Sequence, residues 1–316
     1  PYILLGNLYF NLKQMDQAEQ TYLDAIKHAG GTTRPFLTAA GFYDRTQADE
    51  KAIDMYRRAL EIAPDNFAIK NTLARFHYKR KNLEEAEQMV ADILSQRPNY
   101  RPAQMLQGEM LIAKKAYNKA LALLSDLEKD EPKAARIQYF KGLSYIGTGN
   151  YDQAKVSVAR AVELKPNYVK ALTLLADMYL REKSFNLAVK EAEKAIRLAP
   201  GLTRARMIRA MALAGMNEVD KAQEELTRIS EIEPDAPLAY YQMGMLKMRQ
   251  RQIGEAQSYF EQAASKNRKL VDVFIQIINT LILQKKFDQG LEHCRAQLDI
   301  YKAHPRFQAV VHTVEA

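Results

Sequence analysis

Few side chains in this 316-residue sequence are of a type and spacing that could perform catalysis. The histidines lack the paired spacing of a zinc enzyme; they are His28, His77, His293, His304 and His312. His77 falls where other segments of the chain place Tyr or Leu in an apolar stripe, so we expect it to pack in a core. Cys294 is the single cysteine, which excludes an internal disulfide and a thiolate metal cluster. Because cysteine is among the residues most often buried, we expect Cys294 to be a core residue and not a nucleophile.

Two further motifs share letters with catalytic elements but lack their context. The segment "GTGN" at 147–150 is glycine-rich, but no strand precedes it, and we interpret it as a turn between helices. Glu84 and Glu85 fall in the first turn of a predicted helix, where the helix dipole favours negative charge, and do not form an acid–base pair. The sequence therefore predicts a protein that is not an enzyme and that holds no cofactor and no metal ion.

Charge and hydropathy argue against two other classes of protein. Lys and Arg number 46 against 38 Asp and Glu, a net charge of +8, and the basic residues are dispersed. A nucleic-acid binder of this size usually shows a dense basic run or stripe, so no nucleic-acid partner is expected. No run of 18 apolar residues occurs, and "VDVFIQIINTLIL" is interrupted by Asp272, Gln276 and Asn279, so no transmembrane segment is expected. The sequence starts at a proline without a leader-like stretch, which leaves the compartment open.

The sequence has an internal period of 34 residues. Prolines recur at this interval, at positions 64, 98, 132, 166, 200 and 234. A first series of small residues keeps the same period: Gly6, Ala40, Ala74, Gly108, Gly142, Ala176, Ala210 and Gly244. A second series lies 12 positions further on: Ala18, Ala52, Ala86, Ala120, Ala154, Ala188, Ala222 and Ala256. Eight consecutive units without an insertion or deletion indicate a repeat array.

Each unit has the pattern of two helices. Around the first small residue, apolar residues recur at spacings of three and four, as in Leu172, Leu175 and Tyr179, which predicts a helix. The small residue lets a second helix, which starts near the second-series alanine, approach closely. The recurrent proline ends that second helix because it lacks an N–H group and disfavours helical geometry before it. We expect side-chain caps at the helix starts from Asn82, Asn150 or Ser184 and from Asp65, Asn99, Asn167 and Asp235.

This helical hairpin, with its small, alanine and proline positions, resembles the tetratricopeptide repeat. The resemblance covers essentially the whole chain and implies an all-α fold, an α-solenoid in which stacked hairpins form a right-handed superhelix. It predicts nine tandem repeats over residues 1–304, the first one truncated at its start. Residues 305–316 are expected to form the opening helix of a tenth repeat or a C-terminal capping helix. The ninth unit departs from the pattern, because Ile278 and Gly290 replace its two small residues.

The resemblance also implies a concave groove, lined by the face of each first helix that lies opposite its packing side. The apolar candidates for this face are Leu37, Tyr78, Met105, Ile112, Tyr139, Leu143, Ile146, Met207, Met211, Tyr241, Met245 and Met248. The basic candidates are Arg34, Arg75, Lys79, Arg136, Lys170, Arg181, Arg204 and Arg249. Methionine adapts to varied partners, and large apolar patches usually mark interaction surfaces. We therefore expect a groove with an apolar floor and a basic rim, which binds a protein or peptide with apolar anchors and some acidic residues.

The last complete first helix, "VDVFIQIINTLILQ", is apolar nearly all round, which is typical of a helix buried on every side. Either residues 305–316 fold over it or another chain does. The second alternative would make Ile275, Ile282 and Leu283 an end-to-end interface of a homo-oligomer, and the protein a self-assembling filament or tube.

The leading hypothesis from the sequence is a non-catalytic scaffold for protein–protein interaction, and self-assembly is the first alternative. An RNA-binding solenoid is disfavoured by the methionines of the predicted groove and by the modest charge. By analogy with long bacterial arrays, the resemblance implies envelope assembly or the export of polysaccharide or protein, and a periplasmic or extracellular location.

Overall fold

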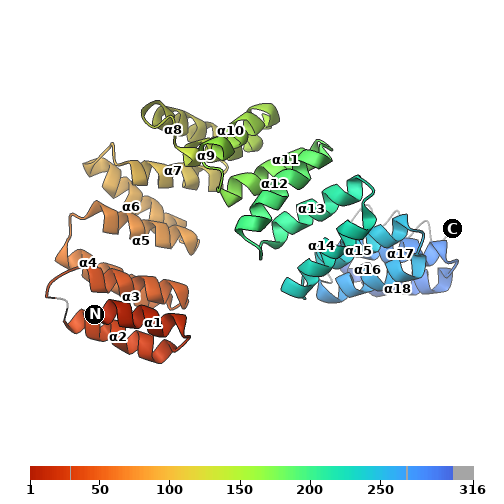
Figure 1. Cartoon of the computed structure of the whole chain (residues 1–316), viewed down its shortest axis with the longest axis horizontal. Helices are drawn as coiled ribbons and strands as arrows, with labels where there is room; N and C mark the ends of the chain where they lie inside the picture. The colour runs from red at the N-terminus through yellow and green to blue at the C-terminus, as the bar shows by residue number, and fades with distance from the viewer. Residues whose placement is uncertain (29, 268–269, 302–316) are drawn as a thin grey trace. The chain divides into compact units, whose positions relative to one another are not determined.

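The computed structural model describes residues 1–28, 30–267 and 270–301, and every regular element in this part of the chain is an α-helix (Figure 1). The chain divides into two compact units, Pro1–Ala154 and Lys155–Ala316. The predicted all-α solenoid is confirmed, because helical hairpins follow one another without a break in sequence order within each unit.

The first unit holds α1 to α9 and the start of α10. Its helices are α1 (Tyr2–Asn11), α2 (Met15–Lys27), α3 (Arg34–Arg45), α4 (Asp49–Ile62), α5 (Phe67–Lys79), α6 (Leu83–Gln96), α7 (Arg101–Ala113), α8 (Tyr117–Asp130), α9 (Ala135–Gly147) and α10 (Tyr151–Leu164). Each odd-numbered helix from α1 to α7 packs against the even-numbered helix that follows it. The odd-numbered helices α5, α7 and α9 also contact one another in sequence order.

The second unit repeats this arrangement. Its helices are α11 (Val169–Arg181), α12 (Phe185–Leu198), α13 (Thr203–Gly215), α14 (Val219–Ile232), α15 (Pro237–Arg249), α16 (Ile253–Lys266), α17 (Val271–Leu283) and α18 (Phe287–Tyr301). Successive helices pack together, and α13 contacts both α11 and α15. The three odd-numbered helices α11, α13 and α15 therefore share one face of the unit.

The two series of small residues lie where helices approach most closely. All eight alanines of the second series have no exposed surface, and the first series is buried as well. At Gly244 an added Cβ would lie 2.5 Å from the ring of Phe260, and at Gly6 it would lie 2.6 Å from the ring of Tyr22. At Gly108, which faces Leu124, an added Cβ would lie 3.4 Å from the leucine side chain. At Gly6 and Gly244 the ring 16 residues further on therefore occupies the space that a Cβ would need.

The turn inside each hairpin has one backbone geometry throughout. The residue with positive φ recurs every 34 positions, at Lys13, Gln47, Lys81, Lys115, Gly149, Lys183, Asn217, Arg251 and Lys285. In the turn after α11, the N–H of Lys183 donates to the carbonyl of Leu180 (3.0 Å), and the N–H of Ser184 donates to the carbonyl of Tyr179 (2.9 Å). This is a Schellman motif, which satisfies the last carbonyls of the odd-numbered helix.

The structure corrects the predicted helix caps. The prolines act as expected, since α12 ends at Leu198, two residues before Pro200, and the other even-numbered helices from α4 to α14 end in the same way. The N-cap of α5, however, is Asn66, whose side chain accepts hydrogen bonds from the N–H groups of Ala68 and Ile69. The predicted N-cap, Asp65, therefore lies one position before the observed N-cap. The side chains of Asn82 and Ser184 make no cap hydrogen bond at the start of α6 and α12.

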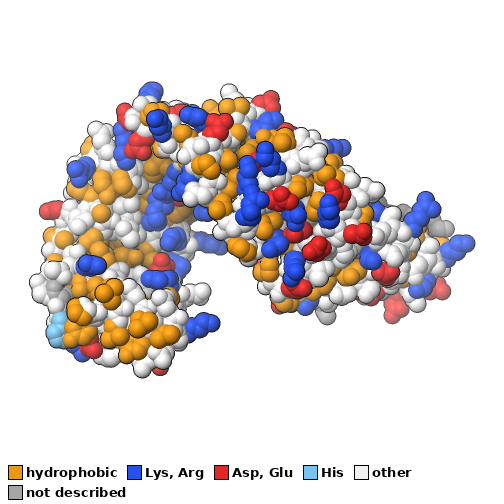
Figure 2. All heavy atoms as spheres, in the orientation of Figure 1, with side chains coloured by type: hydrophobic (Ala, Val, Ile, Leu, Met, Phe, Trp, Pro, Cys, Tyr) orange, Lys and Arg blue, Asp and Glu red, His pale blue; other side chains and the backbone are white. Residues whose placement is uncertain are grey.

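Helix α1 carries a stripe of exposed leucines. The exposed fractions are 75% for Leu4, 42% for Leu5 and 53% for Leu8. Residues at the repeat position of Leu8 in later units are buried, for example Phe42 and Leu246. Hydrophobic side chains accordingly gather over α1 and α2 on the face shown in Figure 2.

Helix α17 is buried along one side through Val273, Phe274, Ile277, Ile278 and Leu281. Residues 305–316, predicted to cap it or to open a tenth repeat, lie outside the described residues. Among the described helices, none combines the length and the apolar character that a membrane span requires.

Candidate functional site

All twenty predicted groove residues lie on odd-numbered helices, from α3 to α15. The apolar members among them are half-buried, and Met211 is exposed to 38%. The basic members Arg34, Lys170 and Arg204 are exposed. The predicted face is thus open to solvent in both units, although its residues differ in what they contact.

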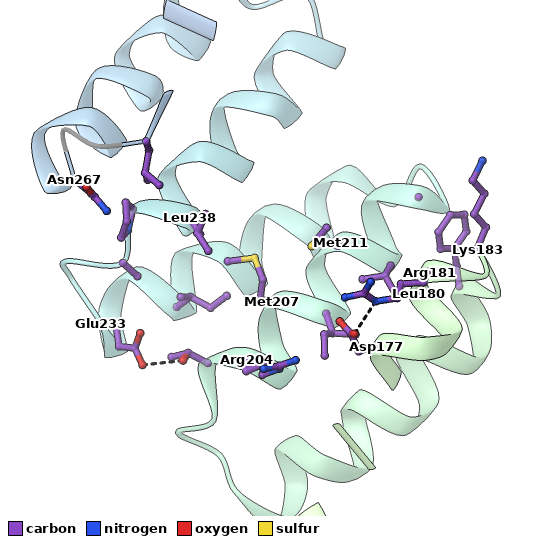
Figure 3. Close-up of a pocket in the computed structure, with 18 of the residues that line it drawn as sticks. Asp177, Leu180, Arg181, Lys183, Arg204, Met207, Met211, Glu233, Leu238 and Asn267 are labelled. Carbon is purple, nitrogen blue, oxygen red and sulfur yellow. Dashed lines mark hydrogen bonds and ion pairs between the residues drawn. The ribbon is translucent and has the colours of Figure 1, made fainter. Parts of the chain in front are cut away.

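In the second unit, the structure brings five of the predicted residues into one open groove of about 970 Å³. We call it the α13 groove, because Arg204, Met207 and Met211 of α13 run along its middle (Figure 3). Helix α11 contributes Arg181 on one side, and α15 contributes Arg249. Because α13 packs between α11 and α15, these three consecutive odd-numbered helices line the groove together.

Apolar residues that the sequence analysis did not name complete the lining: Leu180, Phe185, Ile208, Leu238 and Leu270. Leu180 occupies the repeat position of Ile112, and Leu238 occupies that of Arg34, so the 34-residue register could have identified both. Leu238 is exposed to 55%. Phe185 lies against the end of α13 at Gly215, where an added Cβ would lie 2.5 Å from its ring. No pattern in the local sequence predicts that Phe185 and Leu270 line the groove.

Charged groups concentrate at the two ends of the α13 groove. Figure 3 shows Asp177, Arg181 and Lys183 together at one end, and Glu233 and Asn267 at the other. The Nε of Arg181 donates to Asp177 (2.9 Å), and Nη1 of Arg249 donates to the carbonyl of Ala214 in the last turn of α13 (2.7 Å). At the opposite end, the hydroxyl of Thr203 donates to Glu233 (2.7 Å).

The remaining predicted residues of the second unit lie outside the groove lining. Tyr241, Met245, Met248 and Ile282 pack, partly buried, against the buried cluster of α16 and α17. The ring of Tyr241 lies 5.8 Å from that of Phe260, centroid to centroid. These side chains support the stacking of the last hairpins and leave a part of their surface open.

In the first unit, three of the four predicted cations, Arg75, Lys79 and Arg136, meet acidic partners. Glu109 on α7 is only 12% exposed and pairs with Arg75 of α5 (3.1 Å) and with Arg136 of α9. Lys79 lies 3.7 Å from the carboxylate of Asp44. The Glu109 cluster therefore links three successive odd-numbered helices by charge, and its net charge stays positive.

Around this cluster, apolar candidates pack at the edges of cores. Leu37 contacts the buried cluster of α2 to α5, and Met105 and Ile112 contact that of α8 and α9. The hydroxyl of Tyr78 donates to the carbonyl of Glu109 (3.3 Å), and burial, followed by the nearby Glu109 carboxylate, raises the pKa of Tyr78. Tyr139, Leu143 and Ile146 are half-buried on α9. A cleft of about 370 Å³ in this unit is lined by residues of α4, α5 and α6, among them Arg57, His77 and Met89, and by none of the predicted groove residues.

The predicted end-to-end interface is only partly open. Ile275 and Ile282 are half-buried, whereas Leu283 is exposed to 59%.

Of the residues considered for catalysis, His77 and Cys294 are buried, whereas His28 is exposed; His304 and His312 lie outside the described residues. His77 is 8% exposed, and Cys294 is 2% exposed. No cluster of three His, Cys, Asp or Glu side chains able to hold a metal ion occurs among the described residues. Burial lowers the pKa of His77.

Comparison with known proteins gives a consistent family assignment. Two models described as tetratricopeptide repeat match the chain, one over residues 50–110 and 111–178 and the other over 1–28, 169–201 and 238–269. The chain is 22% identical over 286 residues to anaphase-promoting complex subunit 3 of Schizosaccharomyces pombe, which covers 89% of this chain and 43% of that protein. It is 27% identical over 169 residues to the type IV pilus assembly protein PilF of Pseudomonas aeruginosa, and this match covers 52% of this chain and 66% of that protein. The chain thus spans less than two thirds of either relative.

Solved structures show the same architecture. PilW, described as a type IV pilus biogenesis factor, matches with a TM-score of 0.60 and 18% identity, over 66% of this chain and 96% of that chain. The structure of the Cut9–Hcn1 hetero-tetramer of the anaphase-promoting complex matches with a TM-score of 0.63 and 11% identity, over 98% and 74%. At these identities the similarity concerns the fold alone.

Proposed function

Because the chain belongs to the tetratricopeptide-repeat family, we propose that it is a non-catalytic scaffold that binds a protein partner in the α13 groove. The family fold is of the protein-interaction type, and the proposal adds the place of binding and the chemistry of the partner. The partner presents apolar anchors to the floor and acidic residues to the end of the groove that is lined by Arg181, Lys183 and Arg249.

The observation that carries this proposal is the apolar floor of the groove. Met207, Met211 and Leu238 are open to solvent side by side with Leu180 in a concave surface. Burying such side chains under a partner contributes about 25 cal/mol per Å² of apolar surface removed from water. Methionines also adapt their shape to an anchor at little cost. A scaffold that binds nothing at this face would gain nothing from exposing them.

Names of relatives support a role in assembling a larger structure. One relative is a pilus assembly protein and another is a subunit of the anaphase-promoting complex. We propose that this chain likewise holds components of a multi-protein assembly, with an envelope structure such as a pilus as the preferred case.

Substitution of the floor tests the proposal. Met207→Glu with Met211→Glu places two carboxylates where apolar anchors would bind, and we expect at least about a tenfold loss of partner capture. Both side chains are half-buried or exposed, so helical content and melting temperature should change little. The matched control is Leu187→Glu on α12, a residue that is 44% exposed and lies outside the groove lining.

The measurement is a crosslinking pull-down from native cells with quantitative mass spectrometry. Undiminished capture by the double variant would refute binding in the groove. Equal losses for the double variant and the Leu187→Glu control would point to a binding surface elsewhere.

Self-assembly is a second candidate that we propose to test at the exposed side chain of Leu283 on α17, which is 59% exposed. Ile275 and Ile282 lie half-buried on the same helix. A second copy of the chain could cover these side chains. Light scattering after size exclusion, over a concentration series, would show growth of the particle mass and its suppression by Leu283→Glu. A constant monomer mass would exclude this candidate.

A further inference from the structure

The floor of the α13 groove has a property that selects the conformation of its occupant. Its middle consists of Met207, Ile208 and Met211, flanked by Leu180 and Leu238, and polar side chains stand at its ends (Figure 3). At the end that holds Asp177, polar groups are already engaged with one another, since Asp177 accepts from Arg181 and the carbonyl of Ala214 accepts from Arg249. The floor therefore offers no series of hydrogen-bond donors and acceptors along its length.

An extended peptide would fit such a floor poorly. A strand carries one N–H and one C=O per residue that need partners, and each group buried without one costs about 1–3 kcal/mol. Extended peptides commonly satisfy these groups by adding to the edge of a sheet. No strand, and so no sheet edge, occurs among the described residues. A helix has its backbone hydrogen bonds inside itself and can place an apolar face on methionines without this penalty.

We propose, on the basis of the function proposed above, that the occupant of the α13 groove is an amphipathic α-helix of the partner. Its apolar stripe, at positions i, i+4 and i+7, packs on Met207, Met211 and the flanking leucines. Helix α13 has 13 residues, which corresponds to about 20 Å at 1.5 Å per residue. The matching segment of the partner is therefore about three to four turns long.

Charge complementarity gives this helix one acidic end. Arg181, Lys183 and Arg249 line the groove near the C-terminal ends of α11, α13 and α15, and Asp177 is the only carboxylate among the lining residues there. At the other end, Arg204 is balanced by Glu233. Acidic residues in the terminal turn that lies over Arg181, Lys183 and Arg249 would thus be stabilised, whereas the other end of the partner helix needs no net charge.

Designed peptides of one composition provide the test. The first has leucines in the helical register and acidic residues in one terminal turn. The second has the same residues rearranged so that leucine alternates with polar residues. The third keeps the helical register but exchanges two residues to place a proline at its centre, which breaks a helix. All are labelled with a fluorophore, and binding to the intact chain is followed by fluorescence anisotropy.

We expect the helical peptide to bind at least about tenfold more tightly than either of the other two, a difference of about 1.4 kcal/mol. Its circular dichroism should gain helical signal on binding. Met207→Glu should weaken its binding at least about tenfold, and Leu187→Glu should leave it unchanged. Equal or tighter binding of the alternating peptide would overturn the inference, and so would the absence of Met207-dependent binding by the helical peptide.

These outcomes separate the inference from the proposed function. If Met207→Glu with Met211→Glu abolishes capture of the native partner while the helical peptide has no advantage, the groove binds a partner in another conformation. If neither the peptide nor the native partner depends on Met207, both proposals fall.

Discussion

At the scale of single residues, the size of one side chain decides how closely two helices approach. Gly244 and Phe260 form a pair in which the ring occupies the space that a Cβ at residue 244 would need, at 2.5 Å. Gly108 faces Leu124, and a Cβ at residue 108 would lie 3.4 Å from the leucine side chain, so it would nearly fit. In these two hairpins, the volume available at the first position therefore depends on the side chain 16 residues further on.

Gly244→Ala should lower the free energy of unfolding by about 1–3 kcal/mol, because the methyl group overpacks the contact with Phe260. The cost should be smaller in a Phe260→Leu background, which imitates the Gly108–Leu124 pair. Chemical denaturation of the two single variants and the double variant measures the coupling. The control is Gly254→Ala, a helical position with nothing within 4 Å of the added Cβ, which should be neutral or slightly stabilising. Additive effects at 244 and 260 would contradict the predicted coupling.

His77 is a buried titratable residue without a hydrogen-bond partner for its Nδ1 among the described residues. Burial lowers its pKa, Glu85 opposes this shift, and Arg57 adds to it; the cleft beside His77 is also lined by Lys70 and Asp92. In the unfolded chain its pKa is about 6.5. The unfolded state therefore binds more protons just below that pH, and this contribution to stability is lost as pH falls from about 6.5.

His77→Leu should remove this pH dependence, since Leu213 and Leu281 are buried at the same repeat position. We expect the unfolding midpoint of the parent chain to fall between about pH 7.5 and pH 5.5, and that of the variant to fall less. Urea denaturation at both pH values checks this. Parallel pH profiles for the two proteins would show that His77 does not contribute.

At the scale of elements, the hairpin turn stores strain in eight of the nine described hairpins. Eight of the nine turn residues with positive φ are not glycine, and Gly149 is the exception. An L-residue in this left-handed conformation pays a steric cost of about 1–2 kcal/mol, which glycine avoids. The turn is nevertheless retained, because its Schellman hydrogen bonds satisfy the end of one helix and direct the chain into the next.

Lys115→Gly should therefore raise the free energy of unfolding by up to about 1 kcal/mol, since relief of the steric cost exceeds the entropy gained by the unfolded chain. The same replacement inside a helix, Lys119→Gly in α8, should lower it by about 1 kcal/mol. Thermal and denaturant unfolding compare the two variants with the parent. A loss of stability from both would mean that the left-handed turn carries no strain.

At the scale of the whole molecule, the chain combines a modest positive charge with a groove whose floor is apolar. The net charge is +8. Four basic residues, among them Lys183 and Arg204, and two acidic residues line the α13 groove. Long-range attraction of an acidic partner depends on ionic strength, whereas burial of apolar surface does not weaken in salt. The two contributions to binding can therefore be separated by salt alone.

Partner capture should weaken several-fold when salt rises from about 50 mM to about 500 mM, but it should not disappear. The Lys183→Gln and Arg204→Gln double variant should bind less tightly at low salt and show a smaller salt dependence. Surface plasmon resonance with the captured partner at both salt concentrations provides the measurement. Complete loss of binding at high salt would indicate that charge dominates and that the apolar floor contributes little.

Much of this architecture is local and therefore readable from the sequence. The 34-residue period predicts the hairpins and their stacking, and the small residues at 6, 18 and their repeats identify where helices touch, because both depend on spacing along one helix. The same register predicts which face of the odd-numbered helices stays open. The observed N-cap of α5 is Asn66, one residue after the predicted Asp65. Capping depends on backbone angles, and the residue types around Pro64 do not specify these angles.

Residues of one register nevertheless have different roles in the folded chain, and only packing decides between them. Met207 and Met211 face an open groove, whereas Tyr241, Met245 and Met248 lie against the α16–α17 cluster. Arg75 and Arg136, 61 positions apart, meet on one carboxylate, Glu109. Sequence by itself determined the repeat, its helices and the side on which a partner could bind. The tertiary structure decided where that side is hollow, because the space between neighbouring helices depends on side chains that are distant in sequence and meet only after folding.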